Sequence, residues 1–80
     1  MLKLYTYQSC PYCAKVRQAF AELGIKYQEI DAQRGTPGST ELVKLGGKQQ
    51  VPFLVDEDAG ILMYESDDII AYARARTQKN

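Results

Sequence analysis

The stretch Ser9-Cys10-Pro11-Tyr12-Cys13 lies where a strand pattern gives way to a helical pattern, and it contains both cysteines of the 80-residue chain. Residues 2–7 alternate and are rich in strand-forming side chains, so they predict a β-strand. After the stretch, apolar side chains recur at helical spacing, and Gly24 stands where a left-handed C-terminal cap is expected. The pattern therefore places Cys10 at or just before the N-terminus of a helix and Cys13 inside its first turn.

This placement predicts different roles for the two cysteines. Unpaired backbone N–H groups and the positive end of the helix dipole favour a thiolate, so we expect Cys10 to be a nucleophile with a lowered pKa. Cys13 shares a core-facing stripe with Val16 and Phe20, so we expect it to be more buried and to act second. Residues three apart in a helix have Cα atoms about 5 Å apart, which is within the range of a disulfide. The pair can therefore form and open a local disulfide.

A structural or metal-binding role fits the cysteine pair less well. A structural disulfide across two residues closes almost no loop and gains little stability. A zinc site needs four ligands, and this chain has no histidine and no further cysteine. Two inert thiols stay possible, but the strand before the pair and the helix after it are the context of a redox-active C-x-x-C motif. We therefore expect thiol–disulfide chemistry.

The composition argues against several functional classes. Ten basic and ten acidic residues give a formal net charge of zero, so there is no electrostatic case for binding nucleic acid or a membrane surface. No apolar segment approaches the ~20 residues of a membrane span, and residues 1–5 show no secretion signal. The chain has only the two cysteines of a redox-type pair, which fits a reducing compartment. We expect one domain over residues 1–80, cytoplasmic and monomeric.

The rest of the chain predicts a second strand, a short helix, two more strands and a final helix. The three strands are expected over residues 25–30, 51–55 and 61–64. The short helix is expected from Ser39 or Thr40 to Leu45, after a loop over residues 31–38, and the final helix from Ser66 onward, with a fraying tail over residues 74–80. The first strand-helix-strand unit predicts parallel pairing, and the last two strands predict an antiparallel hairpin. Ser66 is expected to cap the final helix, with two acidic residues in its first turn. The predicted fold is α/β, a four-stranded mixed sheet flanked by three helices in a thioredoxin-like arrangement.

Three motifs at this spacing resemble those of a known family. Cys10-Pro11-Tyr12-Cys13 resembles the active site of the dithiol glutaredoxins, Val51-Pro52 resembles their Thr-Val-Pro element, and Ser66-Asp67-Asp68 resembles their final-helix motif. The second half also resembles the N-terminal domain of glutathione S-transferases, in which a similar Val-Pro precedes a pair like Glu65-Ser66. The resemblance covers essentially the whole chain and implies the glutaredoxin form of the thioredoxin-like fold.

The resemblance implies a glutathione-binding groove beside the cysteines. Val51, before a cis Pro52, would pair its backbone with the peptide of glutathione as an added strand would. The backbone at Ser66 would receive the γ-glutamyl carboxylate, and Asp67 would pair with the ammonium group. The implied glutathione-binding residues are Tyr12, Lys48, Gln50, Val51, Pro52, Glu65, Ser66 and Asp67. If these residues have only structural roles, they are a proline at a sheet edge, a well-capped helix and a surface aromatic side chain.

The chain departs from the glutaredoxin pattern in three places. Tyr7 stands three residues before the first cysteine, where the family usually has a lysine or arginine that lowers the thiol pKa and meets the glycyl carboxylate. We expect Lys48 to supply the carboxylate contact instead, and Lys15 and Arg17 to lie on the solvated face of the first helix. The other departures, which point towards the transferase-like subgroup, are Gln50 for threonine and Tyr64-Glu65 for Gly-Gly.

The activity implied by the resemblance is glutathione-dependent thiol–disulfide exchange. Cys10 would attack a protein–glutathione mixed disulfide and become glutathionylated, and either a second glutathione or Cys13 would resolve that state. Glutathione would be the reductant and co-substrate, and the partners would be glutathionylated or disulfide-bonded proteins. No metal is expected.

Two other functions stay open. In an iron–sulfur carrier, Cys10 of two chains and two glutathiones would hold a cluster; Pro11 argues against this, because cluster-binding relatives tend to have a smaller residue there. Glutathione conjugation would need a second, all-helical domain to hold an electrophile, which residues 1–80 do not provide. The same reasoning leaves room for the chain to be a fragment of a longer one.

Overall fold

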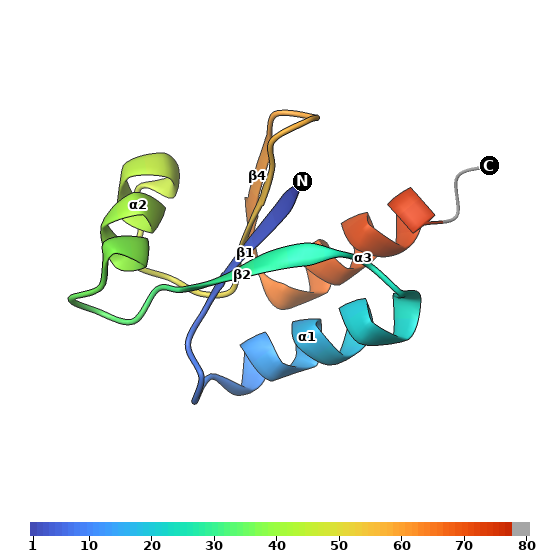
Figure 1. Ribbon diagram of the computed structural model, residues 1–80, viewed down its shortest axis with the longest axis horizontal. Coiled ribbons are helices and arrows are strands. Elements are labelled where there is room, and N and C mark those ends of the chain that lie inside the picture. Colours follow the sequence, from blue (N-terminus) through green and yellow to red (C-terminus); the bar gives the residue numbers. More distant parts are fainter. Residues whose placement is uncertain (78–80) are drawn as a thin grey trace.

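The computed structural model describes residues 1–77 (Figure 1). Within this range it contains β1 (Leu2–Thr6), α1 (Pro11–Leu23), β2 (Tyr27–Asp31), α2 (Pro37–Gly46), β3 (Phe53–Asp56), β4 (Ile61–Tyr64) and α3 (Ser66–Thr77). The strand order is β2-β1-β3-β4; β1 and β2 are parallel, and the other two pairs are antiparallel. The predicted α/β fold, with a four-stranded mixed sheet and three helices, is confirmed.

The helices cover both faces of the sheet. Helices α1 and α3 lie side by side on one face and α2 lies on the other (Figure 1). Alternation along β1 sends Leu2 and Leu4 towards α1 and α3, and Tyr5 towards α2. The core on the first face comprises Leu2, Leu4, Val16, Phe20, Leu54, Ile69, Ile70 and Ala73. The smaller core beneath α2 comprises Tyr5, Ala32, Leu42, Phe53 and Val55.

Helix α1 begins and ends where the sequence predicts. Cys10 is its N-cap residue, and Pro11 occupies the first helical position, where its missing N–H costs nothing. Gly24 adopts a left-handed conformation with φ 68°, and its N–H bonds to the last-turn carbonyls of the helix. Cys10 therefore stands at the boundary between the loop that follows β1 and the first turn of α1.

Helix α2 begins earlier than predicted. Its N-cap is Thr36, whose Oγ1 accepts a hydrogen bond from the Ser39 N–H at 3.1 Å, and Pro37 is its first residue. The prediction of Ser39 or Thr40 as the cap was wrong because Pro37 and Gly38 were assigned to a loop. Proline fits the first helical turn, and a Cβ atom at position 38 would overlap the Asp31 carbonyl, so the helix can pack here only with glycine.

Two strands begin later than predicted. The Ile25 N–H bonds to the Phe20 carbonyl at 3.0 Å, so residue 25 closes the end of α1 and β2 starts at Tyr27. Strand β3 starts at Phe53, because Val51 and Pro52 form a bend before it. Proline has no N–H to give to a sheet, which accounts for its position outside the strand.

Helix α3 differs from the prediction at both ends. Ser66 is its first residue and not its cap; the preceding Glu65 has φ 76°, and its carbonyl accepts a hydrogen bond from the Ile69 N–H at 3.0 Å. Residues 74–77, expected in a fraying tail, continue the helix to Thr77. The rest of the predicted tail, residues 78–80, lies outside the described part of the chain.

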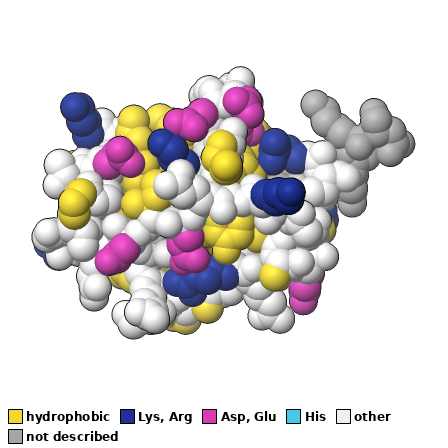
Figure 2. All heavy atoms as spheres, viewed as in Figure 1, with side chains coloured by type: hydrophobic (Ala, Val, Ile, Leu, Met, Phe, Trp, Pro, Cys, Tyr) yellow, Lys and Arg dark blue, Asp and Glu magenta, His cyan; other side chains and the backbone are white. Residues whose placement is uncertain are grey.

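The surface carries charges of both signs. On the face seen in Figure 2, basic and acidic side chains are intermixed, so this face has no broad region of one sign. The surface ion pairs include Lys3 with Glu57 at 3.1 Å. Within residues 1–77, no helix combines the length and the apolar character that crossing a membrane requires.

Candidate active site

The two cysteines lie at the start of α1 with different exposure. Cys10 is half-buried and Cys13 is fully buried, and both are free thiols. The Cys10 sulfur accepts a hydrogen bond from the Cys13 backbone N–H at 3.3 Å, as an N-cap side chain does. The predicted difference in burial is therefore confirmed, and Cys10 is the sulfur that a substrate can reach.

Burial holds the Cys13 thiol in its protonated form. Desolvation is the largest contribution that raises the pKa of Cys13 to about 12, and a side-chain hydrogen bond with Cys10 raises it further. A hydrogen bond from the Tyr7 backbone and the positive charge of Arg17 act in the opposite direction. Cys13 is therefore a neutral thiol near pH 7 and must lose its proton before it can attack a disulfide.

A groove of about 430 Å³ opens beside the start of α1. It is lined by Tyr12, Gln50, Val51, Pro52, Glu65, Ser66 and Asp67. These residues come from three separate parts of the chain: the first turn of α1, the bend before β3 and the start of α3. The structure thus brings together seven of the eight predicted glutathione-binding residues.

The wall formed by residues 50–52 has the backbone that the resemblance implies. The Val51-Pro52 peptide bond is cis, which confirms that expectation. Gln50 Nε2 donates a hydrogen bond to Glu65 Oε2 at 2.9 Å, so this wall is tied to the start of α3. Tyr12, which also lines the groove, is 63% exposed, so its aromatic ring is accessible to a ligand.

The start of α3 offers both hydrogen-bond donors and a carboxylate to the groove. Glu65 occupies the left-handed region that non-glycine residues rarely adopt, and the chain enters α3 immediately after it. The first backbone N–H groups of a helix have no partners within it, so they can receive an anion. Asp67 lies in the same turn, and its Oδ1 pairs with Lys15 Nζ at 2.5 Å. This end of the groove therefore has donors for a carboxylate and an acceptor for an ammonium group.

Lys48 does not reach the groove. Its Nζ lies over the Tyr64 ring, 5.5 Å from the centroid, and its backbone N–H and carbonyl both bond to the Tyr64 hydroxyl. The structure therefore does not support the predicted contact between Lys48 and a glycyl carboxylate.

Arg17 is a residue near the cysteines that the sequence reasoning missed. It was expected on a solvated face, but its side chain is 27% exposed and binds two groups behind the cysteines. Its Nε donates to Glu29 Oε2 at 2.5 Å, and its Nη2 donates to the Tyr7 carbonyl at 2.9 Å. The spacing in the sequence could have indicated this position. Arg17 follows Cys13 by four residues, and residues four apart lie on the same side of a helix.

The chain matches a family of known proteins over nearly its whole length. The family described as glutathione S-transferase, N-terminal domain, matches residues 4–80. This chain belongs to that family. It is also 36% identical over 72 residues to glutaredoxin 2 of Escherichia coli K12, covering 89% of this chain and 32% of that protein. Over 51 residues it is 39% identical to glutaredoxin 1 of Rickettsia felis, covering 61% of this chain and 50% of that protein.

Solved structures of similar proteins agree with this family. Glutaredoxin 2 from Salmonella typhimurium in complex with glutathione is 29% identical with a TM-score of 0.82, covering 99% of this chain and 33% of that one. A diazinon-metabolizing glutathione S-transferase of the silkworm Bombyx mori is 26% identical with a TM-score of 0.82, covering 98% of this chain and 39% of that one. The thioredoxin-like fold is therefore confirmed. The chain spans half or less of the length of each of these relatives.

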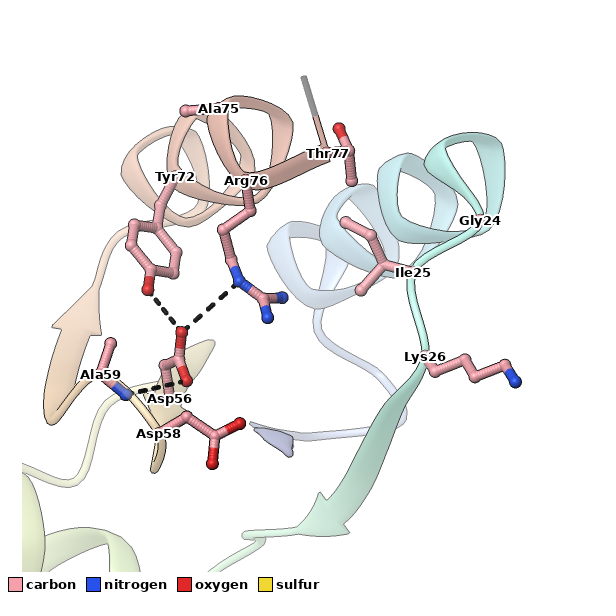
Figure 3. Close-up of a pocket in the computed structure, with 10 residues that line it drawn as sticks. All are labelled: Gly24, Ile25, Lys26, Asp56, Asp58, Ala59, Tyr72, Ala75, Arg76 and Thr77. Atoms are coloured by element: carbon pink, nitrogen blue, oxygen red, sulfur yellow. Dashed lines mark hydrogen bonds and ion pairs between the residues drawn. The ribbon is translucent and has the colours of Figure 1, made fainter. Parts of the chain in front are cut away.

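A second cavity lies away from the groove beside the cysteines. It measures about 710 Å³ and is bounded by the end of α1, the β3–β4 turn and the second half of α3 (Figure 3). Asp56, 2% exposed, lies at its wall and accepts hydrogen bonds from the Tyr72 hydroxyl and the Ala59 N–H, with Arg76 Nε at 3.6 Å. Because both oxygens of this carboxylate are paired within the fold, we assign it a structural role. Among residues 1–77, no three histidine, cysteine or acidic side chains form a group that could hold a metal ion.

Proposed function

We propose that this chain catalyses glutathione-dependent thiol–disulfide exchange and reduces protein–glutathione mixed disulfides and protein disulfides. The observation that carries the proposal is the pairing of a half-buried thiol with a groove that begins two residues away, at Tyr12. The glutaredoxin relatives and the glutathione complex of the Salmonella protein support it. We further propose that the chain acts as a monomer in a reducing cytoplasm.

Each part of the groove suits one part of glutathione. The backbone of Val51 would pair with the tripeptide in the manner of an added strand. The free N–H groups at the start of α3 would hold the γ-glutamyl carboxylate, and Asp67 would bind its ammonium group in place of Lys15. Tyr12 would pack against the tripeptide on the open side. Glutathione is thereby held at the α-carbon end of its γ-glutamyl unit and along its peptide backbone.

In the first step, Cys10 attacks the glutathionyl sulfur of a mixed disulfide. A bond forms between the Cys10 sulfur and the glutathione sulfur, and the bond to the protein sulfur breaks. The protein leaves as a thiolate that takes a proton from water. The substrate protein is reduced, Cys10 is oxidised to a mixed disulfide, and the glutathionyl group stays in the groove.

Two routes can resolve glutathionylated Cys10. A second glutathione thiolate attacks the bound glutathionyl sulfur, which releases glutathione disulfide and restores Cys10. Alternatively, Cys13 attacks the Cys10 sulfur and expels glutathione, which leaves the internal disulfide. Because the pKa of Cys13 is raised by burial, only a small fraction of it is thiolate near pH 7. We therefore propose that external glutathione carries most of the flux.

The test is glutathione-dependent reduction of a small glutathione mixed disulfide by the native protein, Cys10→Ser and Cys13→Ser. We expect Cys10→Ser to abolish turnover and Cys13→Ser to retain at least about half of it. Reduction of a protein disulfide should require both cysteines. Equal activity of Cys10→Ser and the native protein, or no turnover by the native protein despite a reactive Cys10, would refute the proposal.

A further inference from the structure

Arg17 joins the segment before the cysteines to the second strand. Its Nη2 bonds to the Tyr7 carbonyl at 2.9 Å, and its Nε bonds to Glu29 Oε2 at 2.5 Å. The same glutamate oxygen accepts a hydrogen bond from Thr6 Oγ1 at 2.7 Å, so the guanidinium is held by a carboxylate that is itself held by β1. Arg17 therefore has a fixed position and bridges α1, β2 and the loop after β1.

The segment held by Arg17 touches both cysteines. The Tyr7 carbonyl also accepts a hydrogen bond from the Cys10 N–H at 3.4 Å, and the Tyr7 backbone lowers the pKa of the Cys13 thiol. Arg17 is thus linked to the backbone of Cys10 through Tyr7, and the same residue acts electrostatically on the Cys13 thiol. None of its partners lines the groove in which glutathione would bind.

We propose that Arg17 is a positioning residue for the step in which Cys13 attacks glutathionylated Cys10. It holds the Tyr7 backbone against both cysteines, and it places a positive charge beside the buried sulfur that must become a thiolate. The inference rests on the proposed function in taking glutathionylated Cys10 as the physiological starting state. The step itself, closure of the Cys10–Cys13 disulfide, can start from any mixed disulfide on Cys10.

The charges around Cys13 support this role. Arg17 lowers the pKa of Cys13, whereas burial and the neighbouring Cys10 side chain raise it. Burial alone would raise the pKa of Glu29, but hydrogen bonds from Arg17 and Thr6 lower it, so Glu29 stays ionised and keeps the guanidinium in place. The hydrogen bond to Glu29 in turn raises the pKa of Arg17, which keeps its charge.

The step balances without an added oxidant. The Cys13 thiol gives its proton to water, and its thiolate attacks the Cys10 sulfur. The Cys10–Cys13 bond forms, the bond from Cys10 to glutathione breaks, and glutathione leaves as a thiolate that takes a proton. Cys13 is oxidised and the glutathione sulfur is reduced.

The test follows Cys13 directly with Ellman's reagent, a small aromatic disulfide that releases one coloured thiolate when Cys10 attacks it and a second when Cys13 closes the disulfide. Stopped-flow absorbance at pH 7 separates the two phases. We expect Arg17→Gln to slow the second phase about three- to tenfold, because fewer Cys13 thiolates form and part of that loss is offset by their higher nucleophilicity. The first phase should change by less than about twofold. Arg17→Lys keeps the charge but cannot span both partners, so it should recover part of the rate.

Two controls separate this role from a general effect on folding. Arg74→Gln removes an exposed arginine from the far part of α3 and should leave both phases unchanged. Turnover of a glutathione mixed disulfide by Cys13→Ser should be the same with and without Arg17→Gln. An unchanged second phase in Arg17→Gln, or equal slowing of both phases, would overturn the inference. Because Ellman's reagent needs no glutathione site, these results hold whether or not the protein turns over glutathione substrates.

Discussion

At the scale of single residues, one helical turn gives two thiols different access to water. Cys10 caps the helix and is half-buried, whereas Cys13 faces the core with Val16 and Phe20. A buried thiol resists ionisation because its thiolate would lose the stabilisation of water. The order of reaction that we propose, Cys10 first and Cys13 second, rests on this difference.

We therefore predict that Cys13 is almost unreactive in the folded protein. In Cys10→Ser, alkylation of Cys13 by iodoacetamide at pH 7 should be more than about a hundredfold slower than in concentrated urea. Replacing Cys10 removes the contributions of its thiol that raise the pKa of Cys13, but burial, the largest contribution, remains. Because a raised pKa means that the thiolate appears only at high pH, the rate should increase about tenfold per pH unit between about pH 7 and 9. Equal rates in folded and unfolded protein would contradict this prediction.

Some residues of the site could be predicted from the sequence and others could not. The cysteines and the groove residues lie in short motifs whose spacing is typical of the fold, and the structure brings the groove residues together beside the start of α1. Arg17 could not be assigned, because its partners Glu29 and Tyr7 lie in other segments and their proximity depends on the packing of α1 against the sheet. The position of Lys48 over the Tyr64 ring could not be predicted, because nothing in the sequence indicates that contact.

At the scale of elements, polar side chains tie helices to strands at the ends of the sheet. Asp56 ends β3 and accepts a hydrogen bond from Tyr72 of α3, with Arg76 of the same helix close by (Figure 3). This carboxylate joins the β3–β4 hairpin to the last helix. Pro11 and Gly24 correctly predicted both ends of α1, whereas Pro37 at the start of α2 was assigned to a loop. Strands β2 and β3 begin later than their sequence patterns predict.

Asp56→Asn should lower the free energy of unfolding at pH 7 by about 1–3 kcal/mol, because charge-assisted hydrogen bonds are lost from a buried site. The Tyr72 hydrogen bond is the main reason why the pKa of Asp56 is lowered. A group with a lowered pKa stabilises the fold above its unfolded pKa of about 3.9 and loses this effect as the pH falls through its folded pKa. Urea unfolding should therefore show the difference between native and variant shrinking below about pH 4. Asp58→Asn, at the exposed neighbouring carboxylate, should cost less than about 1 kcal/mol, and equal costs for both variants would rule out this role.

At the scale of the whole molecule, the groove exists only when three distant segments meet. Tyr12 belongs to α1, residues 50–52 precede β3, and residues 65–67 begin α3. The mixed sheet brings these segments together, because β1 and β3 are neighbours and α1 and α3 share one face. The topology follows from the order and hydrophobic patterns of the elements, whereas the groove's details, such as the left-handed Glu65, depend on how the ends of these elements pack.

A ligand of this groove should therefore stabilise the whole fold. We predict that S-methylglutathione, which has no free thiol, raises the free energy of unfolding by about 1.4 kcal/mol at ten times its dissociation constant. Asp67→Asn should weaken binding roughly tenfold, because the ammonium group of the ligand loses a charged partner. Asp68→Asn is the matched control, since Asp68 lies in the same turn of α3 but does not line the groove. Urea unfolding of the native protein, Asp67→Asn and Asp68→Asn, each with and without the ligand, measures the change in the free energy of unfolding. If the ligand does not stabilise the native protein, it does not bind the fold. If both substitutions reduce the stabilisation equally, Asp67 does not recognise the ligand in this groove.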